Sequence, residues 1–399
     1  MISTGFHPQV GGVERQLLGL ATALAREGYP VDVLTRYLGT GPVDEELCGV
    51  KVHRVRLLHS SRTLASASFL FGGLRWIRSQ VPSPTSSDRS LPIDIFHCHQ
   101  AFSATNLGVL AKRMLGGGRV VAKITISGVL SEMAAATRDL PFALIRRKLL
   151  NDVDAFIAIS DEIFREIHAA GIPEHRIVRI PNGVAIPERS SLSSESRERA
   201  RAALSYPWNR IAVFVGRLAW EKGLFVLLDA WKEVSAKLPD AGLVLVGDGG
   251  SFRNVEDELR ERVSTLGLTS SVLFAGRQAD VGPLLRSANL LVQPSFSEGM
   301  SNAVLEAMAS GRAVVASDLP SNRELIRPEE SGYLVPAGRA RELATALSTA
   351  LESTEKTDRM GLNARETVER SYSFDRVVER YRALYEDLTA RGRTAAVHS

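Results

Sequence analysis

The sequence holds only two cysteines, Cys48 and Cys98, among 399 residues. Two thiols cannot form a disulfide framework, so the class of small disulfide-rich secreted domains is excluded and a reducing compartment is favoured. No apolar stretch reaches the roughly 20 residues that cross a bilayer, and no signal peptide is visible. We therefore expect a cytoplasmic protein.

Metal-binding patterns and short internal repeats are also lacking. His97 and His99 share a face of a predicted strand, because alternate strand residues point the same way, whereas Cys98 points to the other face. No further ligands stand at zinc spacing, so we expect no metal. His99, at the carboxyl end of that strand, either points into a ligand cleft or is a structural histidine.

Charge of one sign is not in large excess, since the net charge is +4. Residues 1–186 contain 21 Lys and Arg against 16 Asp and Glu. This surplus suits anionic lipid or a phosphorylated acceptor, or it is ordinary surface charge. We expect no nucleic-acid partner.

Strand and helix patterns alternate along the whole chain, which predicts parallel sheets wrapped by helices. The length of 399 residues exceeds one compact core. Residues 188–201 are rich in serine and charge and read as a linker or a solvated helix start. We expect one doubly wound domain over 1–187, a linker over 188–204 and a second such domain over 205–372. A final helix is expected within 373–399. Residues 1–4 read as the tail of a first strand, which is short or begins before Met1.

The segment SFSEGMSNAVLEAMASG at 295–311 follows a buried-strand pattern and starts a helix. A helix N-terminus offers unpaired N–H groups and a positive dipole end, which favour an anion such as phosphate. Glu298 and Glu306 lie eight positions apart around this start. Carboxylates repel phosphate but accept hydrogen bonds from hydroxyls, so the segment suits a nucleotide sugar.

The segment VGRLAWEKG at 215–223 leaves another predicted strand at its carboxyl end, where ligands bind in open α/β sheets. Arg217 and Lys222 suit a diphosphate there, as a planar fork and a point charge. Two solvated surface cations would be the default explanation for this segment alone. The helix start at 295–311 in the same sheet favours a shared anion site.

Three further segments carry weaker signals. Gly11 and Gly12 allow a close approach of the backbone to a ligand or form a simple tight turn. LVLVGDGG at 243–250 lacks the full dinucleotide fingerprint, so a nicotinamide cofactor is disfavoured. The backbone of 274–277, ending at Arg277, suits pairing with a nucleobase edge.

The segment LASASFLFGGLRWIR at 64–78 mixes aromatic residues with Arg75 and Arg78. Such a mixture is compatible with contact to a membrane surface, although core packing is the commoner explanation. Gly72 and Gly73 are expected to interrupt any helix here.

Taken with these motifs, the chain resembles the retaining glycosyltransferases of family 4, which have the two-domain GT-B architecture. The resemblance spans almost the whole length. It is carried by HPQVGGVERQLLGLATALAREGYPVDVLT, DAFIAISDEIFREI, IPNGV, VGRLAWEKG, VLFAG, SEGMSNAVLEAMASGRAVVAS and SGYLVP. It implies two Rossmann-like domains facing a central cleft, with the C-terminal helix crossing back to the N-terminal, acceptor-side domain.

The resemblance also implies roles for individual residues. Arg217 and Lys222 would hold the donor diphosphate, Glu306 the ribose hydroxyls and Glu298 the hydroxyls of the transferred sugar. The implied catalytic residues are Glu298, Arg217 and Lys222, without a metal or other cofactor. The other donor-binding candidates are Gly11, Gly12, Arg277, Gly299, Met300, Ser301 and Asn302.

One departure concerns the acceptor side. Many relatives carry a T-x-H-G-like stretch where this chain has Thr125-Ile126-Ser127-Gly128, so Ser127 stands in place of a histidine that often contacts the sugar. His99, Lys123 and Ser127 are the acceptor-side candidates, and the loops at 60–90 and 128–148 are expected to select the acceptor.

The resulting hypothesis is retaining transfer of a sugar from a UDP- or GDP-linked donor to a hydroxyl of a carbohydrate or lipid-linked acceptor. Cell-surface polysaccharide or glycolipid synthesis is the expected setting. The enzyme would be cytoplasmic, with contact to the inner membrane face as a further expectation. A sugar-nucleotide epimerase of the same architecture and a catalytically silent nucleotide-sugar-binding protein are the alternatives.

Overall fold

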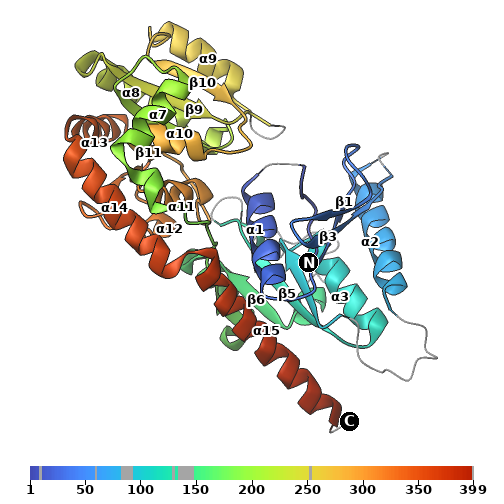
Figure 1. Cartoon of the computed structure of the whole chain (residues 1–399). Helices are drawn as coiled ribbons and strands as arrows, with labels where there is room; N and C mark the ends of the chain where they lie inside the picture. The colour runs from blue at the N-terminus through green and yellow to red at the C-terminus, as the bar shows by residue number, and fades with distance from the viewer. Residues whose placement is uncertain are drawn as a thin grey trace. The chain divides into compact units, whose positions relative to one another are not determined.

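The computed structural model describes residues 1–8, 11–58, 61–81, 93–127, 131–133, 148–250 and 254–397. The chain forms two compact units, which we describe separately (Figure 1). The first contains Met1–Gly183 and Phe374–Ser399, and the second contains Val184–Ser373. Both are layered α/β structures, so the predicted fold class is confirmed.

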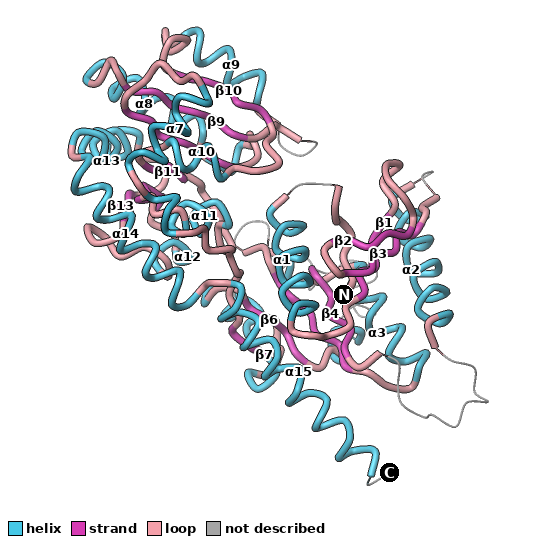
Figure 2. Tube along the Cα trace, in the orientation of Figure 1, coloured by secondary structure: helices cyan, strands magenta, loops and turns pink. Residues whose placement is uncertain are grey.

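The first unit is built on parallel strands flanked by helices (Figure 2). Its strands are β1 (Asp32–Arg36), β2 (Asp44–Leu47), β3 (Val50–Val55), β4 (Ile95–His99), β5 (Arg119–Ile124), β6 (Ala155–Ala158) and β7 (Ile177–Arg179). Its helices are α1 (Gly12–Arg26), α2 (Arg62–Ser79), α3 (Ser103–Leu115), α6 (Asp161–Ala169) and α15 (Phe374–Val397), with a short 3-10 turn η2 (Glu174–Arg176). Only β2 runs antiparallel to its neighbour, β3, among the described strand pairs.

The first three residues join two groups of strands into one sheet. The strand orders are β1-β3-β2 and β4-β5-β6-β7. Ile2 forms parallel bridges to Leu34 of β1 and to Cys98 of β4, and its amide donates to the His97 carbonyl at 2.8 Å. The short first strand predicted at 1–4 therefore lies in the middle of this sheet.

Helix α2 corrects the expectation for Gly72 and Gly73, because it runs without a break through both. Ser61 caps its start by accepting a hydrogen bond from the Leu64 amide at 3.2 Å. A Cβ atom at Gly72 would lie 2.4 Å from a methyl carbon of Val55, and one at Gly73 would lie 2.5 Å from a methyl carbon of Leu107. The glycines thus let the helix pack tightly against β3 and α3.

The two faces of α2 differ, which bears on the membrane hypothesis. Phe69 and Ile77 are buried in the core, as the core-packing explanation requires. Phe71 is 75% exposed, and Arg75 and Arg78 are exposed as well. In the described part of the chain, no helix combines the length and apolar character needed to cross a membrane.

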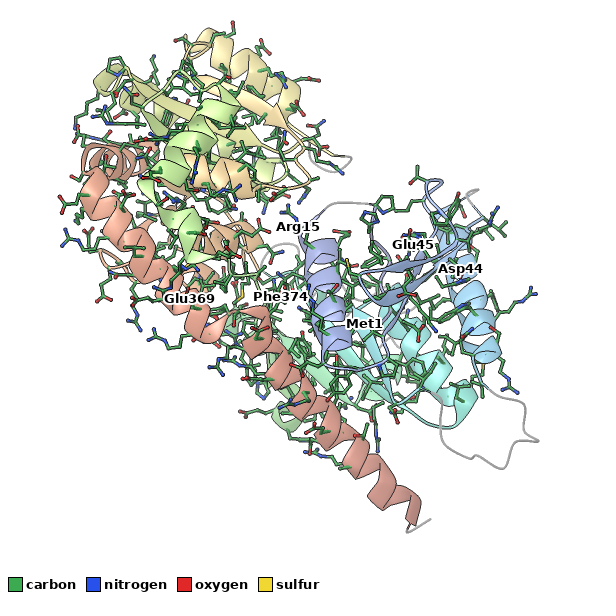
Figure 3. All side chains as sticks on the ribbon, viewed as in Figure 1. Met1, Arg15, Asp44, Glu45, Glu369 and Phe374 are labelled. Atoms are coloured by element: carbon green, nitrogen blue, oxygen red, sulfur yellow. The ribbon has the colours of Figure 1, made fainter. Side chains whose placement is uncertain are left out.

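Helix α15 completes the first unit although it follows the second in sequence. Its Val377, Val378 and Tyr381 share one buried cluster with Leu20 of α1 and Ile157 of β6. The ring of Phe374 lies against α1, where a Cβ atom at Gly19 would be 2.1 Å from it (Figure 3).

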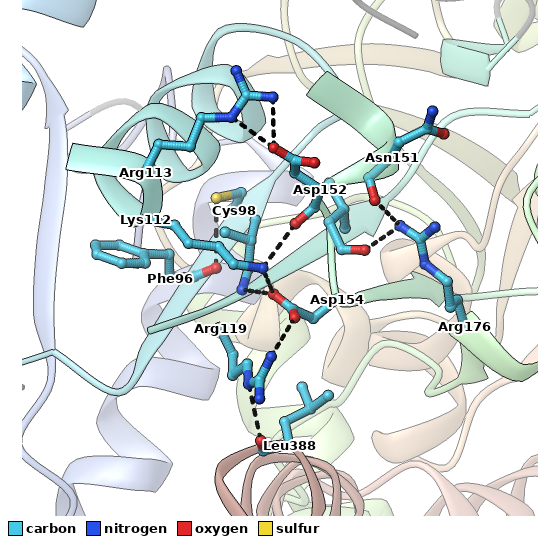
Figure 4. Close-up of polar contacts among 12 residues, drawn as sticks. Phe96, Cys98, Lys112, Arg113, Arg119, Asn151, Asp152, Asp154, Arg176 and Leu388 are labelled. Carbon is cyan, nitrogen blue, oxygen red and sulfur yellow. Dashed lines mark hydrogen bonds and ion pairs between the residues drawn. The ribbon is translucent and has the colours of Figure 1, made fainter. Parts of the chain in front are cut away.

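A polar network anchors the C-terminal part of α15 to β5 (Figure 4). Arg119 of β5 donates to the Leu388 carbonyl at 3.2 Å and to the Asp154 carboxylate at 3.0 Å. Asp154 also accepts from Lys112 at 2.6 Å and from the Val120 amide at 2.7 Å. This carboxylate therefore joins α3, β5 and, through Arg119, α15.

The second unit holds a parallel sheet in the order β10-β9-β8-β11-β12-β13. Its strands are β8 (Arg210–Val215), β9 (Ala241–Val246), β10 (Val272–Gly276), β11 (Leu290–Gln293), β12 (Ala313–Ser317) and β13 (Gly332–Val335). Its helices are α7 (Ser194–Leu204), α8 (Leu224–Lys237), α9 (Glu256–Thr265), α10 (Gly282–Ser287), α11 (Asn302–Ala309), α12 (Pro320–Arg323), α13 (Ala340–Glu352) and α14 (Thr354–Ser371), with 3-10 turns η3 (Arg189–Leu192) and η4 (Trp220–Lys222).

Strands β8, β9, β11 and β12 of this sheet are buried on both faces, which explains their nearly continuous apolar sequences, whereas the edge strand β10 is partly exposed. On one face, Phe214 of β8 and Leu245 of β9 pack with Trp231 of α8 and Leu347 of α13. Residues 188–204, expected to be a linker, contain η3 and α7, and α7 packs against α10.

The strand order of the second unit changes direction between β8 and β11. From β8 the chain proceeds outward to β9 and β10, and it then returns to β11 on the other side of β8. Ligands of open α/β sheets bind at such a switch point, beyond the carboxyl ends of the strands. The loops after β8 and β11 therefore frame the expected site.

Candidate active site

The loop after β8 is held tightly against the end of β11. Gly223, in the left-handed region with φ +68°, ends η4, and a Cβ atom there would lie 2.0 Å from the Pro294 carbonyl oxygen. The Phe296 amide donates to the Glu221 carbonyl at 2.9 Å. Only glycine fits at position 223, and this close approach brings Lys222 to the loop that follows β11.

Helix α11 starts at the end of that loop. Ser301 is its N-cap and accepts from the Val304 amide at 3.4 Å, and the first turn contains no acidic residue. The amides at 300–302 therefore lie at the positive end of the helix dipole without a carboxylate in the first turn. The helix start predicted within 295–311 is thus confirmed, and its anion binding stays a prediction.

Glu298 is the centre of a buried polar cluster in front of α11. Its carboxylate oxygen Oε1 accepts from Lys222 Nζ at 2.7 Å, from Gln293 Nε2 at 2.7 Å and from Ser295 Oγ at 2.8 Å. The Ser321 hydroxyl donates to the Glu298 carbonyl at 3.0 Å. These contacts give the side chain one orientation between the ends of β8 and β11.

The charge state of Glu298 follows from the same contacts. Burial works to raise the pKa of Glu298, but the Lys222 ammonium and the hydrogen bonds from Lys222, Ser295 and Gln293 together lower the pKa below its usual value. The carboxylate is therefore ionised at neutral pH and acts only as a hydrogen-bond acceptor.

Arg217 is the second basic residue in the loop after β8. Its guanidinium lies 2.5 Å from Oε1 of Glu221, four residues further along the same loop. The Glu221 side chain is 7% exposed, whereas that of Arg217 is 46% exposed. Each of the two candidate phosphate ligands thus has a carboxylate partner in this structure, Glu221 for Arg217 and Glu298 for Lys222.

The other donor-side candidates lie on the same edge of the sheet. Glu306 is the fifth residue of α11 and is half-buried, as is Asn302, the first residue. Arg277 follows β10 and makes two hydrogen bonds to Asp248, which follows β9, at 2.8 and 3.1 Å. Arg277 is therefore two strands away from the loop that carries Lys222.

Gly11 and Gly12 belong to the first unit. Gly11 is the N-cap of α1 and Gly12 is its first residue, so this helix start has no side-chain cap. Their contribution to a donor site stays a prediction.

Two of the acceptor-side candidates, His99 and Lys123, lie in a buried basic cluster of the first unit. His99 stacks on His97 with ring centroids 4.7 Å apart, which confirms that the two histidines share a face. His97 Nδ1 lies 2.7 Å from the Tyr385 hydroxyl, and the Lys123 ammonium lies 5.8 Å from the centre of the Tyr381 ring. All three basic side chains are at most 2% exposed.

Burial controls the protonation of this cluster. It lowers the pKa of Lys123 to about 7. Burial, with the Lys123 charge as a further cause, lowers the pKa of His97 and of His99 well below the usual value. Both nitrogens of His99 lack a hydrogen-bond partner among the described residues. His97 and Lys123 contact Tyr385 and Tyr381 of α15, and an acceptor role for His99 and Lys123 stays a prediction.

Ser127, the third candidate, lies against α6. Its hydroxyl is 3.4 Å from a carboxylate oxygen of Glu162, and burial, followed by the nearby Glu166 charge, raises the pKa of Glu162. Gly128 and most of the proposed acceptor loops, 82–90 and 134–147 among them, lie outside the described residues.

Several site residues were missed by the sequence reasoning. Glu221 lies inside VGRLAWEKG, and its spacing of four from Arg217 was an available signal. Gln293 and Ser295 flank Pro294 and carried no pattern of their own. Glu132, 2% exposed, accepts from the Ala101 amide at 2.7 Å and the Thr125 amide at 3.0 Å, and so joins the loops after β4 and β5.

No group of three or more His, Cys, Asp or Glu side chains that could hold a metal occurs in the portion of the chain that the structure describes.

Comparison with known proteins identifies the class and then the family. The fold is similar to Anabaena Alr3699/HepE, whose crystal structure in complex with UDP-glucose has a TM-score of 0.77 at 20% identity and is covered to 98%, against 96% of this chain. Two parallel α/β units of this kind are consistent with the GT-B fold. Residues 11–183 match the Glycosyl transferase 4-like domain, and residues 209–353 match the Glycosyl transferases group 1 family. The chain belongs to glycosyltransferase family 4.

Two curated relatives support this assignment. Phosphatidyl-myo-inositol mannosyltransferase of Mycobacterium leprae is 32% identical over 77% of this chain and 76% of that protein. D-inositol 3-phosphate glycosyltransferase of Corynebacterium glutamicum is 26% identical over 95% of this chain and 92% of that protein.

Proposed function

We propose that this glycosyltransferase moves a sugar from a UDP- or GDP-linked donor to a hydroxyl group of a carbohydrate or lipid-linked acceptor, with retention at the anomeric carbon. The observation that carries the proposal is the Lys222–Glu298 contact of 2.7 Å, made in front of α11 at the β8–β11 switch point. A cation, a carboxylate and a helix N-terminus in one place match a ligand that carries both phosphate and sugar hydroxyls.

The roles proposed for the residues follow from their chemistry. Arg217 and Lys222 neutralise the diphosphate, and the amides at the start of α11 bind the same oxygens. Glu306 accepts hydrogen bonds from the ribose hydroxyls, and Glu298 from those of the transferred sugar. Because Glu298 Oε1 already accepts from three donors, we assign this carboxylate to orientation rather than to nucleophilic attack.

In the proposed step, the bond between the anomeric carbon and the diphosphate oxygen breaks, and the acceptor oxygen bonds to the same face of that carbon. The acceptor proton passes to an oxygen of the departing diphosphate. Negative charge grows on the leaving group, so the fixed positive groups stabilise the transition state more than the bound donor. No protein nucleophile is needed.

The acceptor is proposed from the relatives. One relative is named for phosphatidyl-myo-inositol and another for D-inositol 3-phosphate, both of which carry a phosphate and a ring of hydroxyls. We propose a glycolipid or polysaccharide precursor of similar chemistry. The basic surplus of residues 1–186 is compatible with an anionic acceptor.

The first experiment is a thermal-shift screen with UDP, GDP and their sugars, followed by transfer assays with the stabilising donor. A ligand at a hundred times its dissociation constant stabilises by about 2.7 kcal/mol, which such a screen detects. NMR of the product then reports the anomeric configuration. Inversion would contradict the mechanism. A converted sugar nucleotide without transfer would favour an epimerase, and binding without any turnover would favour a catalytically silent protein.

A further inference from the structure

An aromatic pair lies directly beside the proposed sugar site and has no part in the mechanism above. Trp220 stacks on Phe296 with ring centroids 5.2 Å apart and an angle of 26° between the rings. Trp220 stands two residues before Lys222, and Phe296 stands two residues before Glu298. The same two loops are therefore joined twice, once by the ion pair and once by the aromatic stack.

The exposure of Trp220 sets it apart from an ordinary packing residue. Its side chain is 53% exposed, whereas Trp231, in the core of the same unit, is fully buried. Phe296 covers one face of the indole and the Phe296 amide bonds to the Glu221 carbonyl, so the ring is held by both neighbouring loops. A large aromatic surface that is held in place yet open to solvent is characteristic of a binding residue.

The position of the pair in the sheet separates it from the proposed base side. A Cβ atom at Gly338, after β13, would lie 3.4 Å from the Phe296 ring. Phe296 thus extends from the loop after β11 toward β13, while Asp248 and Arg277, on the proposed base side, follow β9 and β10 on the opposite side of β8. A ligand on Trp220 therefore lies beside Lys222 and Glu298, the proposed sugar side, and away from the proposed base side.

We propose that Trp220, backed by Phe296, is the platform on which a six-membered polyol ring of the acceptor stacks. The aliphatic C–H face of a pyranose or a cyclitol is apolar and of similar size to the indole, whereas its rim of hydroxyls stays available to polar groups. This inference rests on the proposed function and adds the class of acceptor that it uses. Trp220 acts in acceptor binding and specificity and takes no part in the chemical step.

The test compares full-length wild type with Trp220→Ala, Trp220→Phe and the control Leu362→Ala, which removes an exposed side chain from α14 of the same unit. With the donor saturating, inositol 3-phosphate, methyl α-glucoside and ring-free glycerol 3-phosphate serve as acceptors. We expect Trp220→Ala to raise the KM of a ring acceptor by about 2- to 12-fold, the range expected for a lost aromatic stack. Trp220→Phe should retain most of the affinity, and Leu362→Ala should match wild type.

Measurements of donor binding distinguish a failure of this inference from a failure of the proposed function. UDP or GDP affinity and acceptor-independent hydrolysis of the donor should be unchanged in Trp220→Ala. If no nucleotide binds to wild type, the proposed function fails. If the nucleotide binds, saturation-transfer NMR of each acceptor with the UDP- or GDP-saturated protein reads the contact directly, even without turnover.

Two results would overturn the assignment of Trp220 as an acceptor platform. The first is an equal ring contact and an equal acceptor KM in wild type and Trp220→Ala. The second is a loss of binding to phosphatidylinositol vesicles in Trp220→Ala with ring acceptors unaffected, which would make Trp220 a membrane contact. A preference for inositol phosphate over methyl glucoside, or the reverse, identifies the ring as a cyclitol or a sugar.

Discussion

Replacing Glu298 by alanine should separate nucleotide binding from sugar transfer. In the structure, Glu298 neutralises Lys222 at 2.7 Å, so a donor diphosphate must compete with this carboxylate for the ammonium group. Glu298→Ala removes the competitor. We therefore expect UDP or GDP to bind at least as tightly as to wild type, and up to about tenfold more tightly.

Transfer should change in the opposite direction. If Glu298 holds hydroxyls of the transferred sugar, its loss should lower kcat/KM by about 100-fold, which corresponds to about 2.7 kcal/mol of transition-state stabilisation. The assays are calorimetry with the nucleotide and a product assay with the donor that stabilises the protein. Lys222→Ala should weaken nucleotide binding as well as transfer, because the ammonium itself is lost.

The stability cost follows from the burial of the pair. The side chains of Lys222 and Glu298 are 15% and 10% exposed, so removing one partner leaves a largely buried, unpaired charge. We expect a loss of about 2–3 kcal/mol, slightly below the range for fully buried pairs. The control is Glu369→Ala, since Glu369 pairs with the buried Arg365 at 2.6 Å on α14 and should affect melting alone. Unchanged transfer in Glu298→Ala, or a matching loss of nucleotide affinity, would refute the assigned role.

Three further predictions concern the first unit. Burial lowers the pKa of Lys123 to about 7, so the unfolded chain binds more protons than the folded chain between pH 7 and about 10.4, and the stability of this unit rises with pH in that range. Lys123→Met should flatten this rise in denaturation experiments across the range, and a pH profile parallel to that of wild type would contradict the burial of Lys123. Exposed Cys48 should react with a thiol reagent at once, whereas buried Cys98, whose pKa burial raises to about 12, should react only on unfolding. Fast labelling of both thiols in the native protein would contradict the burial of Cys98. Replacing Phe71 and Arg75 by alanine should reduce co-sedimentation with anionic vesicles by several-fold and leave melting unchanged, and equal sedimentation would refute the proposed membrane contact of α2.

Local patterns were sufficient to predict most elements of the fold. The apolar segments at 211–216 and 242–246 became β8 and β9, because strands buried on both faces are recognisable from composition alone. The helix start at Asn302 followed from residues within a few positions of it. The Gly72–Gly73 prediction was wrong because helix propensity ignores tertiary packing, and here the glycines admit Val55 and Leu107.

Contacts between distant residues could not be predicted from local patterns. Lys222 and Glu298 are separated by 76 positions, and only the neighbouring order of β8 and β11 brings them together. His99 looked accessible because it ends its strand, whereas it is fully buried and stacks on His97. The ring of His97 in turn contacts Tyr381 of α15, 284 positions further on. The donor-side candidates could thus be named from motifs and their roles stay predictions, while the burial of the acceptor-side candidates depends on long-range packing.

The route of α15 has a consequence for how the protein is made. Residues 374–397 supply a layer of the first unit, whereas 184–373 form the second as one uninterrupted segment. The ribosome therefore releases the second unit whole before the first has all of its parts. We therefore expect the first unit to complete its folding after the second, contrary to the usual order in which the N-terminal domain of a growing chain folds first. Until translation reaches Leu388 and its neighbours, the face of β4, β5 and β6 that α15 covers lacks this layer, and we expect a nascent chain at that stage to expose an apolar surface.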